Sequence, residues 1–405
     1  MFHYENRKNK KRDLSKNAFN QKGATAALLL TTSLLALTPA APASAWEKPY
    51  TIINTISFGG TPGISGSSPL GLAVDPVRGT LYATNTNYPN KGSVVVIDEA
   101  TGTVTATIQV GEYPYAIAVD PIHYMVWVTD YLGASVSAID ERTNIVVATL
   151  PVGTLPHDIT VDPFQGTVYV ANDGGRNVAV IDEATLTVTT TVAVPNNLPT
   201  VGIGVDPIRG LVGVTTFTSG FLKSYLNVLD ENTDQFINTI TLGSGGSDSN
   251  DVGRLVVDPV RGFVYLPQYF AGTLQVLDEK TATITKTIVS TTLTNPGDGG
   301  PGTNGIALDP FTGTVYVANI NVGTVSVIDP VKGYVKATVT IPNASDELSG
   351  TAVDPILGLA YVANYNNNTI SVISTGKGTS CEEIKDYPLL PLYCKTDLLK
   401  VKDRY

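Results

Sequence analysis

The sequence predicts an all-β fold in which seven four-stranded sheets form one closed ring. Within its 405 residues a tripeptide Val/Leu-Asp-Pro recurs at intervals of 42 to 52 residues, with its Asp at positions 75, 120, 162, 206, 258, 309 and 354. Each unit alternates four segments rich in Val, Ile, Thr and Tyr with turns rich in Gly, Asn and Asp-Pro. Four strands in about 40–45 residues is the period of a propeller blade, so we predict a seven-bladed β-propeller.

The sixth unit shows the order of the strands within a blade. IALD (306–309) is predicted as strand A, TVYVAN (314–319) as strand B, TVSVID (324–329) as strand C and YVKATVTI (334–341) as strand D. The stretch 46–374 shows no helical periodicity. The propeller is therefore predicted to span residues 46–374.

Closure of the ring can also be predicted. The last unit lacks a strand D, whereas residues 50–60 (YTIINTISFGG) match the strand D text of the first unit at 104–111 (VTATIQVG). We therefore expect the N-terminal strand to complete the last blade, which removes exposed sheet edges.

The strand B text carries a resemblance to a known family. It reads YVAN at residues 169–172, 316–319 and 361–364, with a looser copy, YATN, at 82–85. These units resemble the YVTN family of β-propeller repeats over residues 50–374. The resemblance implies a propeller fold and an extracytoplasmic, surface or binding protein, without specifying a ligand.

The two ends of the chain differ from the repeats. Residues 1–22 contain seven basic residues, an apolar run follows at 23–38, and Ala43-Ser44-Ala45 matches a cleavage site, so residues 1–45 are predicted as a signal peptide. A retained membrane anchor is the alternative.

The C-terminal tail, residues 375–405, contains both cysteines, and in an exported chain Cys381 and Cys394 are predicted to form a disulfide. The tail is expected to pack on the propeller, with partner docking as the alternative.

Composition excludes several classes of protein. With 26 Lys+Arg against 36 Asp+Glu the net charge is −10, which disfavours nucleic-acid binding, and 42% hydrophobic residues argue against disorder. No His-Glu-x-x-His, Cys-x-x-Cys-His or Gly-x-Ser-x-Gly motif occurs, and no cofactor is predicted. We expect a secreted or cell-surface protein without a stable membrane span after signal cleavage. Its expected partner is a protein or glycan at the cell envelope.

Departures from the repeat mark the candidate site. The seven Asp residues of the Asp-Pro turns recur in every blade, so they are predicted to accept backbone N–H bonds. One face of strand A is small in most units, but Asp158 and Arg254 violate this rule, and His157 precedes Asp158. We predict that these three residues form a polar cluster at a channel mouth. His123, in an A–B turn on the opposite rim, is expected to be simply exposed.

The loops that connect strand D to strand A and strand B to strand C are expected to share the rim of this channel mouth. They are rich in aromatic residues and in Asn, Asp and Gly. This combination suits sugar or peptide recognition. The candidate ligand-binding residues are Tyr113, Tyr115, His157, Asp158, Arg176, Arg254, Tyr269, Asn304 and Tyr365. Asp248, Asn250 and Asp251 are a weak candidate for Ca²⁺, since a full calcium loop has more acidic positions.

Three functions are compatible with these patterns. The composition of the rim loops favours a binding or interaction module. The first alternative is a propeller hydrolase or lyase that uses His157. The second is a structural surface protein that takes no small ligand.

Overall fold

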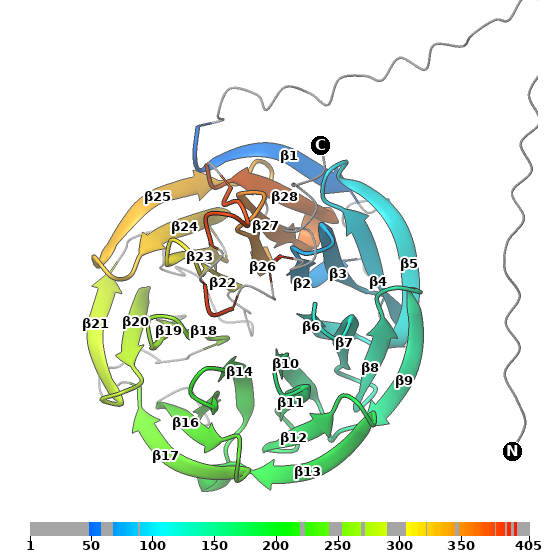
Figure 1. Cartoon of the computed structure of the whole chain (residues 1–405), viewed down its shortest axis with the longest axis vertical. Helices are drawn as coiled ribbons and strands as arrows, with labels where there is room; N and C mark the ends of the chain where they lie inside the picture. The colour runs from blue at the N-terminus through cyan, green and yellow to red at the C-terminus, as the bar shows by residue number, and fades with distance from the viewer. Residues whose placement is uncertain are drawn as a thin grey trace, which may run out of the picture. The chain divides into compact units, whose positions relative to one another are not determined.

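The computed structural model describes residues 48–57, 68–87, 90–218, 223–242, 253–268, 272–289, 305–320, 322–344, 348–376, 378–384, 387–389 and 393–394. All of them belong to one compact unit, Ala45–Tyr405. They form seven antiparallel sheets of four strands each, arranged around a common centre (Figure 1). The predicted all-β seven-bladed propeller is confirmed.

Each blade runs from an inner strand at the centre to an outer strand at the periphery (Figure 1). Blade one contains β2 (Ser68–Asp75), β3 (Thr80–Thr86), β4 (Lys91–Asp98) and β5 (Thr103–Glu112). Blade two contains β6 (Pro114–Asp120), β7 (Met125–Asp130), β8 (Ser135–Asp140) and β9 (Ile145–Pro151). Blade three contains β10 (Pro156–Asp162), β11 (Thr167–Asn172), β12 (Asn177–Asp182) and β13 (Thr187–Ala193).

The remaining blades follow the same order. Blade four contains β14 (Thr200–Asp206), β15 (Leu211–Phe217), β16 (Ser224–Asp230) and β17 (Gln235–Thr241). Blade five contains β18 (Val256–Asp258), β19 (Phe263–Gln268), β20 (Thr273–Asp278) and β21 (Thr283–Val289). Blade six contains β22 (Ile306–Asp309), β23 (Thr314–Asn319), β24 (Thr324–Asp329) and β25 (Tyr334–Thr340). Three of these last four strands have the predicted bounds, and β25 ends one residue early.

Blade seven closes the ring. It contains β26 (Leu348–Asp354), β27 (Leu359–Asn364), β28 (Thr369–Ser374) and, as its outermost strand, β1 (Thr51–Ser57). The register runs antiparallel from Thr51 opposite Ser374 to Ser57 opposite Thr369. The predicted completion of the last blade by the N-terminal strand is therefore confirmed.

Helical structure is nearly absent from the described ranges. Only two three-residue 3-10 turns occur there, η1 (Pro195–Asn197) and η2 (Tyr365–Asn367). No helix among those residues is long and apolar enough to cross a bilayer.

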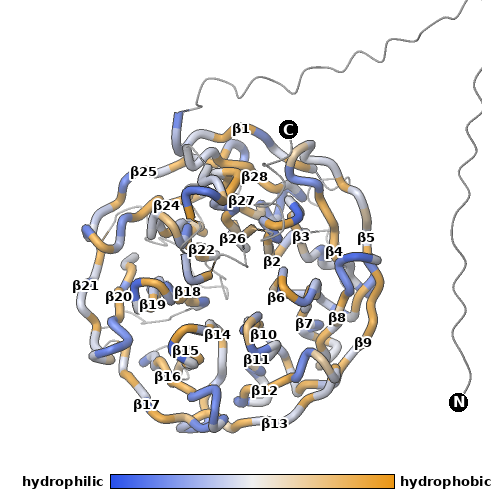
Figure 2. Tube along the Cα trace, viewed as in Figure 1, coloured by the Kyte–Doolittle hydropathy of each residue, from blue (hydrophilic) through white to orange (hydrophobic). Residues whose placement is uncertain are grey.

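An aromatic residue of strand B lies buried in six of the seven blades, and blade four has Gly213 at this position. Tyr82, Trp127, Tyr169, Tyr265, Tyr316 and Tyr361 are all essentially inaccessible to solvent. Tyr82 of blade one, for example, packs with Ile117 and Val126 of blade two. The core is therefore divided among the seams between blades. Along the outermost strands β9 and β13 exposed and half-buried positions alternate, because only one face is covered. Figure 2 shows hydrophobic and hydrophilic residues mixed along the periphery of the ring.

The inner strands approach one another so closely that side chains are excluded at certain positions. A Cβ atom at Gly350 of β26 would lie 2.3 Å from the carbonyl oxygen of Leu70 in β2. The same addition at Gly305 would lie 2.0 Å from the oxygen of Ser349. The predicted small face of strand A thus allows seven strands to converge on the centre.

The Asp-Pro turns have the predicted structural role. Asp75 Oδ1 accepts the N–H groups of Val77 and Arg78 at 2.8 and 3.2 Å. The equivalent carboxylates of Asp120, Asp162, Asp206, Asp309 and Asp354 accept the matching pair of N–H groups. Each carboxylate therefore fixes the turn between an inner strand and the next strand of its blade.

Candidate functional site

The candidate site is built at the start of the inner strands. Tyr115 is the second residue of β6 and His157 the second residue of β10, so adjacent blades present them side by side. Their ring centroids are 4.5 Å apart. The guanidinium carbon of Arg254, which precedes β18, lies 5.6 Å from the Tyr115 ring centroid. Residues from blades two, three and five therefore meet at one end of the inner strands.

Asp158 and Arg254 form a direct ion pair, although their blades are not adjacent. Arg254 Nε lies 3.6 Å from Asp158 Oδ1, and the side chains are only 15% and 8% exposed. The intervening blade four has Gly202 at the equivalent position, where an added Cβ would lie 2.9 Å from Arg254 Cα. The absence of a side chain at Gly202 lets the backbone at Gly253 and Arg254 pack closely against blade four, which places Arg254 within reach of Asp158.

The pair is only partly satisfied. Asp158 Oδ2 accepts the N–H of Ile203 at 3.1 Å. Burial raises the pKa of Asp158, while Arg254 and the hydrogen bonds oppose that rise. Arg254 Nε is buried and has no hydrogen-bond acceptor among the described residues. Within the described part of the chain this buried donor is therefore left without a hydrogen bond, while Asp158 Oδ1 at 3.6 Å balances its charge.

His157 is buried and neutral. Its side chain packs against Tyr115, and Nδ1 lies 2.7 Å from the carbonyl oxygen of Val201. Burial, with the nearby charge of Arg254, lowers the pKa of His157 to about 4. Because a carbonyl oxygen only accepts, Nδ1 must carry the proton and Nε2 is left as an acceptor.

Tyrosines extend the cluster outward. The ring centroid of Tyr131 is 5.5 Å from that of Tyr115 and 6.0 Å from that of Tyr113. Tyr365, the first residue of η2, packs against the same apolar cluster. Tyr131 is not among the predicted ligand-binding residues. Its position in the connection between strands B and C of blade two could have identified it as one.

Of the other candidate residues, only Arg176 is described by the structure, and it is not part of this cluster. Arg176, in the B–C turn of blade three, donates from Nη1 to the carbonyl oxygen of Asn197 at 3.1 Å and is solvent-exposed. Tyr269, Asn304 and the weak calcium candidates Asp248, Asn250 and Asp251 lie outside the described residues. The structure thus brings together Tyr113, Tyr115, His157, Asp158, Arg254 and Tyr365.

The opposite end of the channel is covered by the tail. Cys381 and Cys394 form the predicted disulfide. Leu389 and Tyr393 line a cavity of about 260 Å³ together with the prolines of the Asp-Pro turns. Tyr387 donates its hydroxyl to the carbonyl oxygen of Pro310 at 2.9 Å. The tail packs on the propeller as expected, at the end remote from His157.

His123 is exposed, as expected, but its contacts at that end were not predicted. Its Nδ1 lies 2.9 Å from Asp120 Oδ2 and 3.1 Å from Glu183 Oε2. One sequence pattern could have predicted the contact with Glu183. In five units a Glu follows the Asp of strand C, at positions 99, 141, 183, 231 and 279. Such a repeated acidic residue needs a partner across the seam between blades.

Comparison with known proteins adds support for the fold. The chain is similar to a solved structure of Kuenenia stuttgartiensis hydrazine synthase, with a TM-score of 0.67 and 19% sequence identity, over 78% of this chain and 98% of that chain. The sequence matches no protein-family model, and a search of curated proteins found no match. At 19% identity the similarity shows the seven-bladed propeller fold alone.

Proposed function

We propose that this chain is an exported propeller of the YVTN repeat type that binds a glycan or another cell-envelope component at the mouth formed by Tyr115, His157, Asp158 and Arg254. Residues 1–45 are its signal peptide in this proposal. The disulfide between Cys381 and Cys394 supports an oxidising, extracytoplasmic location.

The observation that carries the proposal is a group of aromatic rings in contact with one another beside the Asp158–Arg254 ion pair. Tyr113, Tyr115, Tyr131 and His157 give a group of rings with centroids 4.5 to 6.4 Å apart. Sugar rings stack their C–H faces on such aromatics while their hydroxyls need hydrogen-bond partners. The Arg254 side chain, 15% exposed, supplies a guanidinium beside these rings, and His157 Nε2 supplies an acceptor.

The state of His157 favours binding over catalysis. A general base works best with a pKa near the operating pH, whereas the pKa of His157 is about 4. Its Nδ1 proton is directed at a backbone carbonyl rather than at a carboxylate, so Asp158 does not complete a triad with it. The ring is suited to hold a ligand hydroxyl in place.

A thermal-shift screen of the purified protein against envelope glycans and peptides tests the proposal. A ligand that binds the folded state raises Tm. The shift, measured from each variant's own Tm, should disappear in Arg254→Met and persist in Arg209→Met, which removes a guanidinium at the other end of the strands. Equal shifts in both variants would place binding elsewhere. Turnover lost in His157→Ala would replace binding by the enzyme alternative, and self-assembly without any ligand would favour the structural one.

A further inference from the structure

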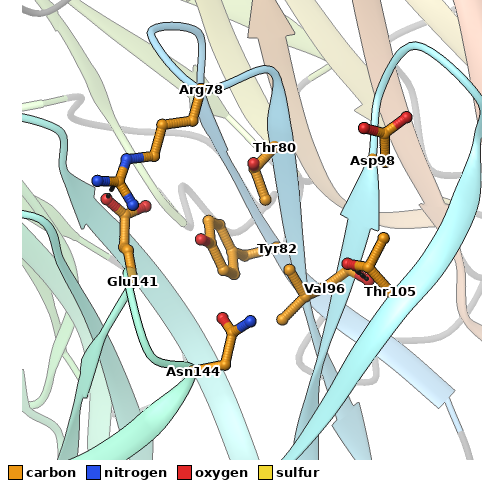
Figure 3. A pocket seen from close by; sticks show the side chains of 8 residues that line it. All are labelled: Arg78, Thr80, Tyr82, Val96, Asp98, Thr105, Glu141 and Asn144. Atoms are coloured by element: carbon orange, nitrogen blue, oxygen red, sulfur yellow. Dashed lines mark hydrogen bonds and ion pairs between the residues drawn. The ribbon is translucent and has the colours of Figure 1, made fainter.

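The seams between blades carry a recurring arrangement in which a cation joins two carboxylates. At the seam between blades one and two, Arg78 Nε lies 3.6 Å from Asp75 Oδ2 and 3.9 Å from Glu141 Oε2. Figure 3 shows Arg78 reaching from its turn to Glu141 of the neighbouring blade. Arg209 repeats this contact at the seam between blades four and five.

At the seam between blades two and three, the arginine is replaced by His123. Asp120 Oδ2, His123 Nδ1 and a Glu183 carboxylate oxygen all lie within 4.8 Å of one another. The Asp120 side chain is fully buried, that of Glu183 is 4% exposed, and that of His123 is 46% exposed. A nitrogen and two oxygen donors therefore converge at a place that solvent can reach.

The other carboxylate oxygens are already occupied, which fixes the orientation of both groups. Asp120 Oδ1 accepts the N–H groups of Ile122 and His123 at 2.7 and 2.9 Å. Trp127 Nε1 donates to Glu183 Oε1 at 2.7 Å. Glu183 Oε2 points at the imidazole and receives no hydrogen bond from the described residues. This oxygen can be satisfied by a shared proton or by a cation.

We propose that Asp120, His123 and Glu183 bind a divalent transition-metal cation, with Zn²⁺ as the best match. Tetrahedral Zn²⁺ with bonds of about 2.0–2.1 Å separates its ligand atoms by about 3.3 Å. The observed separations of 2.9 and 3.1 Å from Nδ1 need to widen only slightly. A water can complete the coordination beside the half-exposed ring, and Trp127 is the outer contact that orients Glu183.

A measurement of metal binding distinguishes the proposed metal site from a cluster that only shares a proton between its carboxylates and imidazole. The metal-free full-length protein is titrated with Zn²⁺ by calorimetry and with Co²⁺ by visible absorption, which reports tetrahedral coordination. We expect one equivalent to bind the wild-type chain and at least 100-fold weaker binding in His123→Arg. That variant is the matched control, since it restores the cation found in blades one and four and so preserves the seam.

Glu183→Gln is the second variant, because the amide oxygen can still accept the Trp127 bond while the anionic ligand is lost. It should also lose Zn²⁺ affinity at least 100-fold. The proposal is overturned if the wild-type chain binds no stoichiometric Zn²⁺, or if wild type and the folded His123→Arg protein bind it equally.

Discussion

Asp158 and Arg254 occupy strand A positions at which the other units have glycine or alanine. Such a position lies between inner strands, where burial makes an unpaired charge costly. Each residue is tolerated because the other is 3.6 Å away, and Gly202 lets the backbone at Arg254 lie close enough for this contact. At the scale of single residues, the site thus depends on two charged residues that both depart from the repeat and that stabilise each other.

Arg254→Met should lower the free energy of unfolding by about 3 kcal/mol, because it leaves the Asp158 carboxylate buried without its partner. Chemical denaturation measures the change. Arg142→Met, which removes the exposed partner of Asp140, is the control and should have little effect.

A double-mutant cycle with Asp158→Ala decides whether the two residues act together. The double variant should be more stable than the sum of the single losses implies, because the second substitution removes the stranded charge. Strictly additive losses would show that the ion pair contributes nothing.

At the scale of elements, β1 joins the two ends of the chain. Its residue Ile56 is 4% exposed and packs with Leu72 and Leu81 of blade one, although β1 belongs to the sheet of blade seven. Ile53 lies on the outer face of the same strand and is 40% exposed. The strand therefore both completes a sheet and contributes to the core at the seam.

Ile56→Ala should destabilise the protein by about 3 kcal/mol, because it removes buried methyl groups and leaves a cavity at the seam. Ile53→Ala, in the same strand, should cost well under 1 kcal/mol. Denaturant titrations of both variants test this difference. Equal losses would mean that β1 stabilises through backbone pairing alone.

At the scale of the whole molecule, buried carboxyl groups link the blades. Burial, with Asp354 beside it, raises the pKa of Glu99 to about 9, and burial beside Asp75 raises that of Glu141 to about 8. Burial beside Asp162 raises the pKa of Glu231 to about 8 as well. The seam between blades seven and one has Leu357 where blade one has Arg78, so no guanidinium fills that position.

These raised pKa values predict a protein that is more stable in mild acid than in base. An unfolded Glu titrates near 4.5, so between that pH and about 9 the folded chain holds protons that the unfolded chain has released. This stability is fully present below about 4.5 and is lost as pH rises through 8 to 9. Thermal unfolding from pH 5 to 9.5 should show a falling Tm.

Glu99→Gln should make that fall shallower, because the amide does not ionise. The same substitution at exposed Glu112 is the control. A Tm that stays constant or increases between pH 6 and 9 would contradict the assignment of protonated carboxyls to the seams.

Local and repeated patterns were enough to predict the architecture. Strand bounds followed from alternating β-rich segments and turns, the blade count from the Asp-Pro repeat, and closure from the match between residues 50–60 and a strand D. Within the site, His157, Asp158 and Arg254 were found as departures from the repeat. Tyr131 was not among the candidate residues, and the contacts of the exposed His123 with two carboxylates were not predicted.

The sequence by itself determined the seven blades, their order, their closure and the disulfide, because each depends on neighbours along the chain or on a pattern repeated in it. Only the tertiary structure decided that Arg254 reaches Asp158, that His157 Nδ1 faces Val201, and that His123 lies between Asp120 and Glu183. Apart from the contact between His123 and Asp120, which lies within one turn, these contacts join different blades. Their distances depend on how the inner strands converge and twist around the centre, and no local sequence pattern specifies this arrangement.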